Sequence, residues 1–421
     1  MIGWKRRLVV AAGLLVACAL AFVAFAWQPA LPRVSSPDIE LTPGLIAQGR
    51  RVVELGDCAV CHSPKGHPAF SGGLGLKTPF GTIYTTNITS DGPTGIGSWS
   101  LAAFVRAMRH GVSRDGHLLY PAFPYIHYTK VTDEDLRAAY AYLMTRPAVR
   151  APAPANDLPL PLRFRPALAF WNLLYLRPGA VPATDHSPLA RGRYLVAGLG
   201  HCSSCHTALG LIGGESGEYL GGGDVDGWHA PSLTTLRDAP RPWTVGQLTD
   251  YLRTGMAGEH GAAAGPMRPV TDNLGEVAPD DVLAMATYLM SIQKGPSHRD
   301  PSPGPGAATS QLARGQALFE VSCAVCHGEA SAMGTHIGRP PLQASSALAG
   351  PTPQNAIMTV FEGIPWPDRP VPAAYMPPFA GTLTDAQVTD LVVYLRSTTG
   401  QAPWPDVDSG VRKARKELSH D

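Results

Sequence analysis

The chain has 421 residues, of which 44% are hydrophobic and 16% are charged, and its formal net charge is +1. A chain of this length holds two to four domains of ordinary size, and a near-neutral charge without basic blocks outside the termini argues against nucleic acid as a partner. The 45 glycines and 41 prolines follow no short period. They indicate long loops that are ordered by something other than a large apolar core, such as bound cofactors.

An apolar run comes first in the chain. Lys5, Arg6 and Arg7 precede twenty apolar or small residues from Leu8 to Trp27. As a helix this run would span about 30 Å, which matches the hydrocarbon core of a bilayer. The basic cluster would stay in the cytoplasm and place the rest of the chain outside. We therefore predict that residues 1–34 are an N-terminal transmembrane anchor.

Two other interpretations of this run stay open. Cleavage after Ala24–Ala26 would fit the small-x-small rule of a signal peptide. Alternatively, Leu15–Cys18 resembles a bacterial lipoprotein box, although the residues after Cys18 remain apolar. All three interpretations export the body of the chain.

From residue 40 onward, one pattern occurs three times. Each copy opens with an amphipathic stretch around Gly49, Gly192 or Gly315, and a Cys-x-x-Cys-His motif follows eight to ten residues later. A middle helix, such as the one expected over residues 100–109, lies among Gly- and Pro-rich loops. Each copy closes with an acidic-capped helix that ends in a Tyr-Leu pair. These closing helices run over residues 132–143, 279–289 and 384–395.

The repeat predicts the fold class. We expect a mainly α-helical chain of three small tandem domains with little sheet. The domains cover residues 40–150, 186–295 and 308–400, an apolar Pro-rich linker covers 151–185, and a C-terminal tail covers 401–421. Within the linker, the apolar segment Leu158–Leu176 either packs between domains or docks on a membrane or a quinone.

The three Cys-x-x-Cys-His motifs have a definite chemistry. Two thiols add to the vinyl groups of a haem, and the adjacent histidine becomes the proximal ligand of the iron. A zinc site built from two cysteine pairs would leave the third pair over, and a thioredoxin-like pair should lie beside a βαβ pattern, which is absent. We predict three covalently attached haem c groups, held by Cys58, Cys61, Cys202, Cys205, Cys323 and Cys326, with His62, His206 and His327 on the irons.

An electron-transfer haem normally needs a second axial ligand, and methionine in this role raises the potential. Met267 lies 61 residues after His206, and Met376 lies 49 residues after His327. Both stand beside a proline just before the closing helix, where a ligand loop is expected. We predict that both bind iron, and the alternative is that each is a flexible core residue.

The first copy departs from this pattern. The position 61 residues after His62 is Phe123, whose side chain cannot bind iron. Met108 lies on the middle helix, on the face expected to meet the porphyrin, and is the favoured sixth ligand. His127, which follows the Phe123 loop, is the alternative. An open, five-coordinate iron is the third possibility.

Several segments resemble the triheme cytochrome c subunits of bacterial membrane-bound dehydrogenases. These segments are 78–89, 95–99, 119–122, 226–231 and 265–267, and they recur in order across nearly the whole chain after residue 40. The resemblance implies three class I cytochrome c domains on the periplasmic side of the inner membrane. It also implies a catalytic partner that oxidises an alcohol, gluconate or an aldehyde, and electron delivery to ubiquinone or a terminal oxidase.

The Phe123 loop refines this resemblance. Alcohol and gluconate dehydrogenase subunits usually have methionine there, whereas Tyr120–Tyr125 followed by His127 resembles the subgroup paired with molybdenum and iron–sulfur aldehyde dehydrogenases. We therefore expect an electron-transfer subunit without catalytic residues of its own. The alternative from another class is a self-standing, peroxidase-like haem enzyme with an open first haem.

Overall fold

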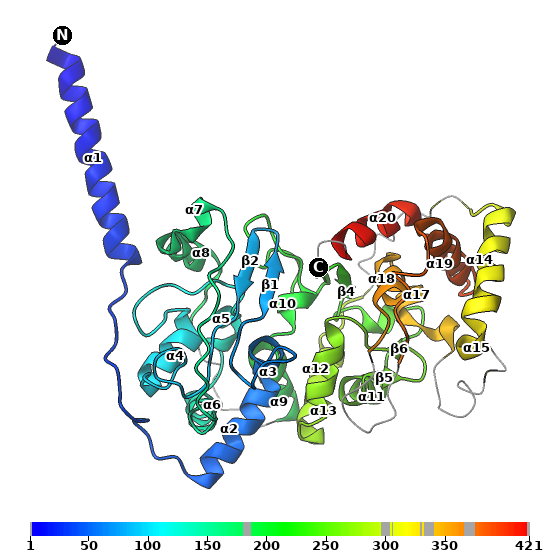
Figure 1. Cartoon of the computed structure of the whole chain (residues 1–421), viewed down its shortest axis with the longest axis horizontal. Helices are drawn as coiled ribbons and strands as arrows, with labels where there is room; N and C mark the ends of the chain where they lie inside the picture. The colour runs from blue at the N-terminus through cyan, green and yellow to red at the C-terminus, as the bar shows by residue number, and fades with distance from the viewer. Residues whose placement is uncertain are drawn as a thin grey trace. The chain divides into compact units, whose positions relative to one another are not determined.

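The computed structural model describes residues 2–179, 187–295, 304, 306–328, 331, 341–365 and 375–418. The chain divides into two compact units, which Figure 1 colours along the sequence. The first unit comprises Met1–Thr184 with Ala197–His201, and the second comprises Asp185–Val196 with Cys202–Asp421. The second unit therefore contains both the second and the third copy of the repeat.

The described residues are mainly helical, as predicted. Their strands form three two-stranded antiparallel sheets, one in the first unit and two in the second. The pairs are β1 (Gly75–Thr78) with β2 (Gly81–Tyr84), β3 (Gly223–Val225) with β4 (Trp228–Ala230), and β5 (Met256–Ala257) with β6 (Gly261–Ala262). The division into three tandem domains stays a prediction.

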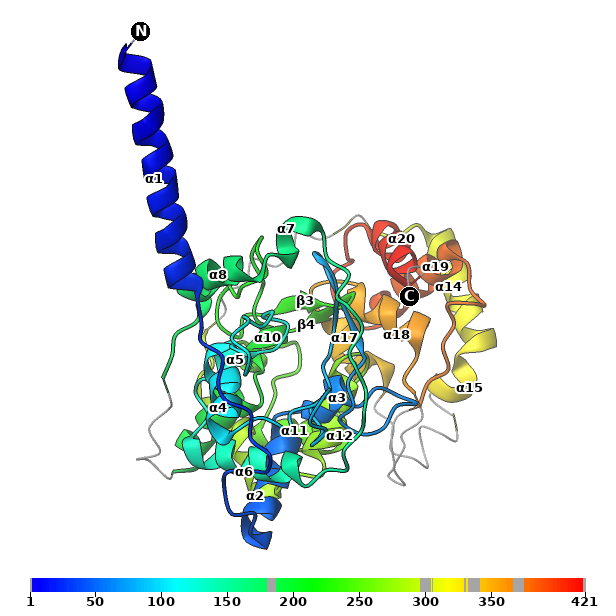
Figure 2. The same cartoon turned by 60° about the vertical axis from the view of Figure 1, so that its left-hand side comes forward.

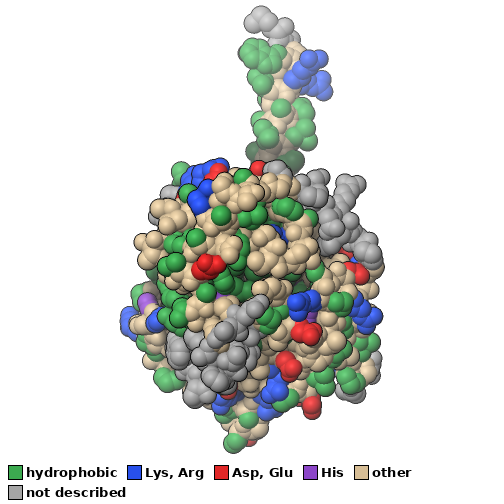
Figure 3. All heavy atoms as spheres, turned by 90° about the vertical axis from the view of Figure 1, so that its right-hand side faces the viewer, with side chains coloured by type: hydrophobic (Ala, Val, Ile, Leu, Met, Phe, Trp, Pro, Cys, Tyr) green, Lys and Arg blue, Asp and Glu red, His purple; other side chains and the backbone are tan. Residues whose placement is uncertain are grey.

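The first unit begins with a long apolar helix. Its elements are α1 (Ile2–Ala26), α2 (Pro43–Leu55), α3 (Cys58–His62), α4 (Leu101–His110), α5 (Tyr125–Tyr128), α6 (Asp133–Met144), α7 (Leu160–Arg163), η1 (Arg165–Ala167) and α8 (Leu168–Tyr175). Residues Arg6–Ala26 of α1 are long and apolar enough to cross a membrane. Figure 3 shows basic side chains near its free end and apolar ones along its length.

The second unit repeats the helical pattern twice. Its elements are α9 (Pro188–Tyr194), α10 (Ser203–His206), η3 (Leu236–Asp238), α11 (Val245–Thr254), α12 (Met267–Leu274), α13 (Pro279–Ser291), α14 (Thr309–Ser322), α15 (Ala324–His327), η4 (Leu342–Ala344), α17 (Ser346–Ala349), α18 (Gln354–Glu362), α19 (Asp385–Ser397) and α20 (Val407–Leu418). A π-helical segment, η2 (Leu195–Leu199), follows α9.

The same helix crossing occurs in all three copies, at the two features that the sequence repeat singles out. The opening helix presents a glycine to the backbone of the closing helix, beside the tyrosine of the Tyr-Leu pair. A Cβ on that glycine would lie about 2 Å from a carbonyl oxygen, so no larger residue fits. The contacts join Gly49 to Ala138 and Tyr142, Gly192 to Ala284 and Tyr288, and Gly315 to Asp390 and Tyr394.

The closing helices begin where the sequence predicts. Thr384 forms a complete capping box with Gln387, and the Thr132 side chain accepts a hydrogen bond from the backbone N–H of Asp135. The segment expected to be a C-terminal tail contains α20. Val407, Val411 and Ala414 form a buried stripe on one face of this helix, which explains why it packs on the third copy instead of remaining a tail.

The second and third copies share contacts within their unit. Trp228 of β4 is buried in a cluster whose other buried residues come from the third copy, including Phe361 and Val388, and from the C-terminal segment. The backbone N–H of His229 donates to Asn355 Oδ1, and Asn355 Nδ2 donates back to the carbonyl of His229, both at 2.8 Å. Strand β4 is thereby fixed to α18.

Candidate haem c sites

In the first motif, the backbone orients the histidine. His62 Nδ1 lies 2.6 Å from the carbonyl oxygen of Thr86, which follows the β1–β2 hairpin. Because a carbonyl only accepts hydrogen bonds, Nδ1 carries the proton, and the lone pair of Nε2 is available to a metal. The backbone N–H of Gly72 also donates to the His62 carbonyl at 2.9 Å. The hairpin therefore selects the tautomer that an iron ligand needs.

The second motif has the same arrangement. His206 Nδ1 lies 2.7 Å from the carbonyl oxygen of Pro231, directly after the β3–β4 hairpin, and Gly222 N–H donates to the His206 carbonyl at 2.9 Å. Burial lowers the pKa of both His62 and His206 below the usual value, so both imidazoles are neutral near pH 7. Neutral imidazole is the form that binds metals.

The pair of thiols in each motif is suited to the covalent attachment of one planar group. The cysteines stand three residues apart on a single helical turn, and all of them are half-buried reduced thiols. Burial raises the pKa of Cys58 and of Cys202 to about 12, so both are protonated near neutral pH. Two thiols and a neutral histidine with its Nε2 available are the donors that haem c attachment uses.

The third motif is described only in part, because residues 329–330 and 332–340 lie outside the described ranges. The N–H of His327 donates to the Cys323 carbonyl at 2.9 Å, which keeps the motif on one turn. Cys323 and Met376 both border the hydrophobic cluster around Phe361. The fold therefore brings the third motif and its predicted methionine ligand to the same core.

Met267 is the first residue of α12, and the turn before it is fixed by a close approach. Gly265 has φ +51°, and a Cβ added there would lie 2.2 Å from the Trp228 ring. Only glycine allows this loop conformation and this contact together. Because Trp228 begins β4 and Pro231 follows it, one strand contacts both the His206 ring and the Met267 loop.

Met376 is held by its own backbone. Its N–H donates to the Ile364 carbonyl at 2.9 Å, and its carbonyl accepts from the Ile364 N–H at 2.8 Å. Gly363 has φ +68°, and a Cβ there would lie 2.2 Å from the Met376 carbonyl oxygen. As at Gly265, a glycine with positive φ allows the chain to approach the methionine loop closely.

In the first copy, aromatic residues occupy the corresponding loop. The Phe123 ring packs against Tyr125 and Tyr128, with centroids 6.2 and 5.5 Å apart. Tyr128 Oη donates to the Gly56 carbonyl at 2.9 Å, two residues before Cys58. This bond ties the Phe123 loop to the first motif.

The two candidate sixth ligands of the first copy lie in different environments. His127 is 2% exposed on α5, whereas Met108 on α4 is half-buried. Met108, Leu252 and Val360 each lie three residues before a glycine that ends the middle helix. Those glycines, with their φ angles, are Gly111 (61°), Gly255 (72°) and Gly363 (68°). The equivalence of the three positions follows from these helix ends, and the choice between Met108 and His127 stays a prediction.

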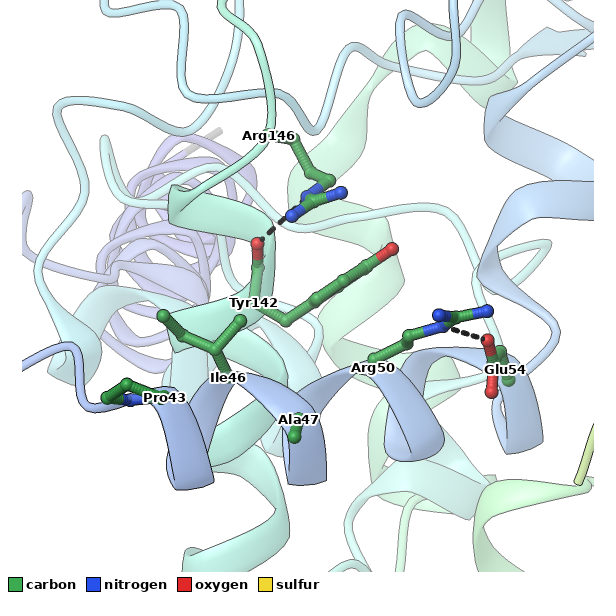
Figure 4. A pocket seen from close by; sticks show the side chains of 7 residues that line it. All are labelled: Pro43, Ile46, Ala47, Arg50, Glu54, Tyr142 and Arg146. Atoms are coloured by element: carbon green, nitrogen blue, oxygen red, sulfur yellow. Dashed lines mark hydrogen bonds and ion pairs between the residues drawn. The ribbon is translucent and has the colours of Figure 1, made fainter. Parts of the chain in front are cut away.

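An open pocket beside α2 and α6 is not one of the candidate haem sites (Figure 4). It is lined by Pro43, Ile46, Ala47, Arg50, Glu54, Tyr142 and Arg146. Arg50 pairs with Glu54 at 2.7 Å, and the Arg146 guanidinium lies 4.1 Å from the Tyr142 ring centroid. Its cations are thus already paired or stacked, and none of the predicted haem residues lines it.

Sequence reasoning missed the carbonyl groups of Thr86 and Pro231, which orient the two histidines. Backbone acceptors have no side-chain signature. The spacing is nevertheless a usable signal, since these carbonyls follow their histidines by 24 and 25 residues.

The chain is similar to known cytochrome c proteins. The cytochrome c family matches residues 189–293 and 312–399. The chain is 42% identical to a nicotinate dehydrogenase subunit of Pseudomonas putida over 89% of its length, but it spans only 32% of that protein. It is 37% identical to the gluconate 2-dehydrogenase cytochrome c subunit of Pantoea cypripedii. The aligned region covers 86% of this chain and 87% of that subunit.

A third relative is the cytochrome c subunit of a quinone-type alcohol dehydrogenase of Gluconobacter oxydans. It is 35% identical, over 88% of this chain and 82% of that subunit. Cytochrome c domains bind haem c covalently, and these relatives are named as subunits of dehydrogenases. The chain therefore belongs to the family of cytochrome c subunits of membrane-bound dehydrogenases, which transfer electrons and are not the catalytic subunits.

Proposed function

We propose that the chain holds three haem c groups and relays electrons from a catalytic dehydrogenase subunit to ubiquinone or the respiratory chain. It does so on the periplasmic side of the inner membrane, with α1 as its anchor. The observation that carries this proposal is the shared backbone design of the first two motifs, in which a hairpin carbonyl orients each histidine at 2.6 or 2.7 Å. The first copy, although outside the matched family ranges, has the same proximal side.

The cysteines, histidines and methionines have separate roles at each haem site. Bound haem c supplies one-electron redox chemistry. The cysteine pairs hold it covalently, and His62, His206 and His327 bind the iron through Nε2. Met267 and Met376 serve as sixth ligands that raise the potential, and Met108 does so in the first copy unless His127 takes its place.

The identity of the catalytic partner is the more specific part of the proposal. The Phe123 loop favours a molybdenum and iron–sulfur aldehyde dehydrogenase, with alcohol or gluconate dehydrogenase next. The similarity to a nicotinate dehydrogenase subunit supports a dehydrogenase of an aromatic acid as a further candidate.

Gentle purification from the native membrane tests the relay. We expect a catalytic dehydrogenase subunit to co-purify, and its substrate to reduce all the haem of the complex. Isolation of the chain alone, or haem that no such substrate reduces, would refute the proposal. A version of the chain that begins near Pro37 behind a cleavable signal should keep its haems and become far more easily extracted from the membrane, because it lacks α1.

A further inference from the structure

Exposed apolar side chains gather on α7 and α8, in the segment that the sequence marks as a linker. We call this set the α7–α8 apolar surface: Leu160, Leu162, Phe164, Phe170, Leu173 and Leu174. Leu160 is 79% exposed and Leu173 is 62% exposed. So many large apolar side chains close together are unusual on a water-facing surface and mark an interaction site.

Helix α8 is held firmly by its opposite face. Ala169 and Trp171 are buried, and the Tyr125 hydroxyl donates to Asn172 Oδ1 at 2.6 Å. Phe170, Leu173 and Leu174 therefore point outward together, because residues three and four apart share one face of a helix. Their exposure follows from the way α8 is docked on the first unit.

The surface is continuous with the apolar helix α1. The Phe170 ring stacks on Phe22 of α1, with centroids 5.1 Å apart and planes at 9°, and lies 5.9 Å from the Phe25 ring. Ala26 and Ala169 belong to one buried cluster. Both views of the ribbon show α7 and α8 on the side of the first unit from which α1 extends (Figures 1 and 2).

The contact between Phe170 and Phe22 determines how deep α8 lies in the bilayer. The apolar span Arg6–Ala26 is about 31 Å long at 1.5 Å per residue, so it fills a hydrocarbon core and ends near its outer boundary at Ala26. Phe22 lies four residues inside that end, about 6 Å deep. Since Phe170 stacks on Phe22, it reaches a similar depth, which is typical of helices that lie in the membrane interface.

The charge of the segment suits a lipid surface. Residues 158–177 contain three arginines and no acidic residue. Arg163 and Arg177 lie among the apolar residues and donate to backbone carbonyls of the same segment. Such basic side chains are attracted to anionic lipid headgroups, while the neighbouring leucines and phenylalanines enter the acyl boundary.

We infer that the α7–α8 apolar surface lies in the outer interface of the phospholipid bilayer, as a second, in-plane membrane contact beside α1. The first unit is thus held at two points and keeps one face toward the lipid. This inference rests on the proposed role of α1 as a retained anchor and goes beyond it, because a single spanning helix would leave the unit free to tilt.

The test uses the full chain with its haems, purified without a partner and reconstituted in vesicles of phosphatidylethanolamine and phosphatidylglycerol. In a Cys18→Ser background, Leu173→Cys is compared with Ala102→Cys, an exposed position on α4 of the same unit. Each variant is treated with a charged maleimide, and its rate is divided by the rate of the same variant unfolded in urea. Unchanged haem spectra confirm that both variants are folded.

We expect Leu173→Cys to react at least about tenfold more slowly than Ala102→Cys, because a charged reagent enters the apolar interface poorly. Equal rates in protein that floats with the vesicles would overturn the inference while leaving the anchor intact. Failure to float would instead refute the anchor. If protection of Leu173→Cys disappeared when the protein was diluted in excess lipid, a second copy of the chain would cover the surface, and the inference would be wrong.

Discussion

The first and second motifs have the same proximal side and different distal sides. His62 and His206 both direct Nδ1 to a carbonyl that follows a β-hairpin, at 2.6 and 2.7 Å. In the second copy, a glycine turn against Trp228 precedes Met267, the predicted sixth ligand, whereas the first copy has Phe123 among tyrosines. The acceptors that orient these two histidines are backbone carbonyls, which tolerate sequence change. The distal ligand is a side chain, so a single substitution alters it and the potential that it sets.

The largest effect should come from removing a thiol pair. Cys58→Ala with Cys61→Ala should lower the haem content, measured by the pyridine haemochrome assay, from about three to about two per chain. The first unit should become sensitive to protease while the second stays resistant, because the lost group belongs to the first unit alone.

The matched variant, Cys202→Ala with Cys205→Ala, should lower the haem content equally. It should also loosen the third copy, since Trp228 is part of that copy's core. Identical protease patterns for the two variants would contradict the sharing of one unit by the second and third copies.

Replacing the methionines tests the distal side. Met267→Ala and Met376→Ala should each remove one Met-ligated low-spin signal and lower one potential, because the thioether stabilises ferrous iron. The long-wavelength methionine–iron band and a redox titration measure both effects. An undiminished band in the double variant would show that these loops do not ligate, because only the Met108 contribution of the first copy should remain.

Two substitutions distinguish Met108 from His127 as the sixth ligand of the first copy. We expect Met108→Leu to convert one iron to the high-spin state and to leave the other signals unchanged, as measured by electron paramagnetic resonance. His127→Ala should then have little effect on spin state. A bis-histidine spectrum that vanishes in His127→Ala would reverse this assignment and make the first and second sites differ in ligand type.

The smallest expected effect concerns the turn before Met267. Gly265→Ala forces a Cβ against the Trp228 ring at a positive φ, and it should destabilise the second unit by about 1–3 kcal/mol. Thermal unfolding followed at the methionine–iron band measures it. Gly258→Ala is the control, because a Cβ there has nothing within 4 Å. Equal melting of the two variants would mean that the loop is not fixed by Trp228.

Much of this molecule can be predicted from its sequence, for physical reasons that differ between features. Covalent attachment needs adjacent Cys and His residues, and helix crossings need a small residue, so Cys58, His62 and Gly49 leave a local pattern. The sixth ligand of the first copy does not, because either a methionine or a histidine can bind iron and it can come from different elements of the fold. The packing of Trp228 into the neighbouring copy depends on residues more than a hundred positions away, for which a single sequence has no signal.

The paired hydrogen bonds between His229 and Asn355 have a consequence for electron tunnelling. Tunnelling rates fall exponentially with the gap between donor and acceptor, so a hinge between two redox centres would make the rate fluctuate with every excursion. Strand β4 touches the second site and is joined to α18 of the third copy by two bonds of 2.8 Å. We therefore expect the gap between the haems proposed for these two copies to be set when the unit folds, so that electron transfer between them does not depend on the motion of separate domains.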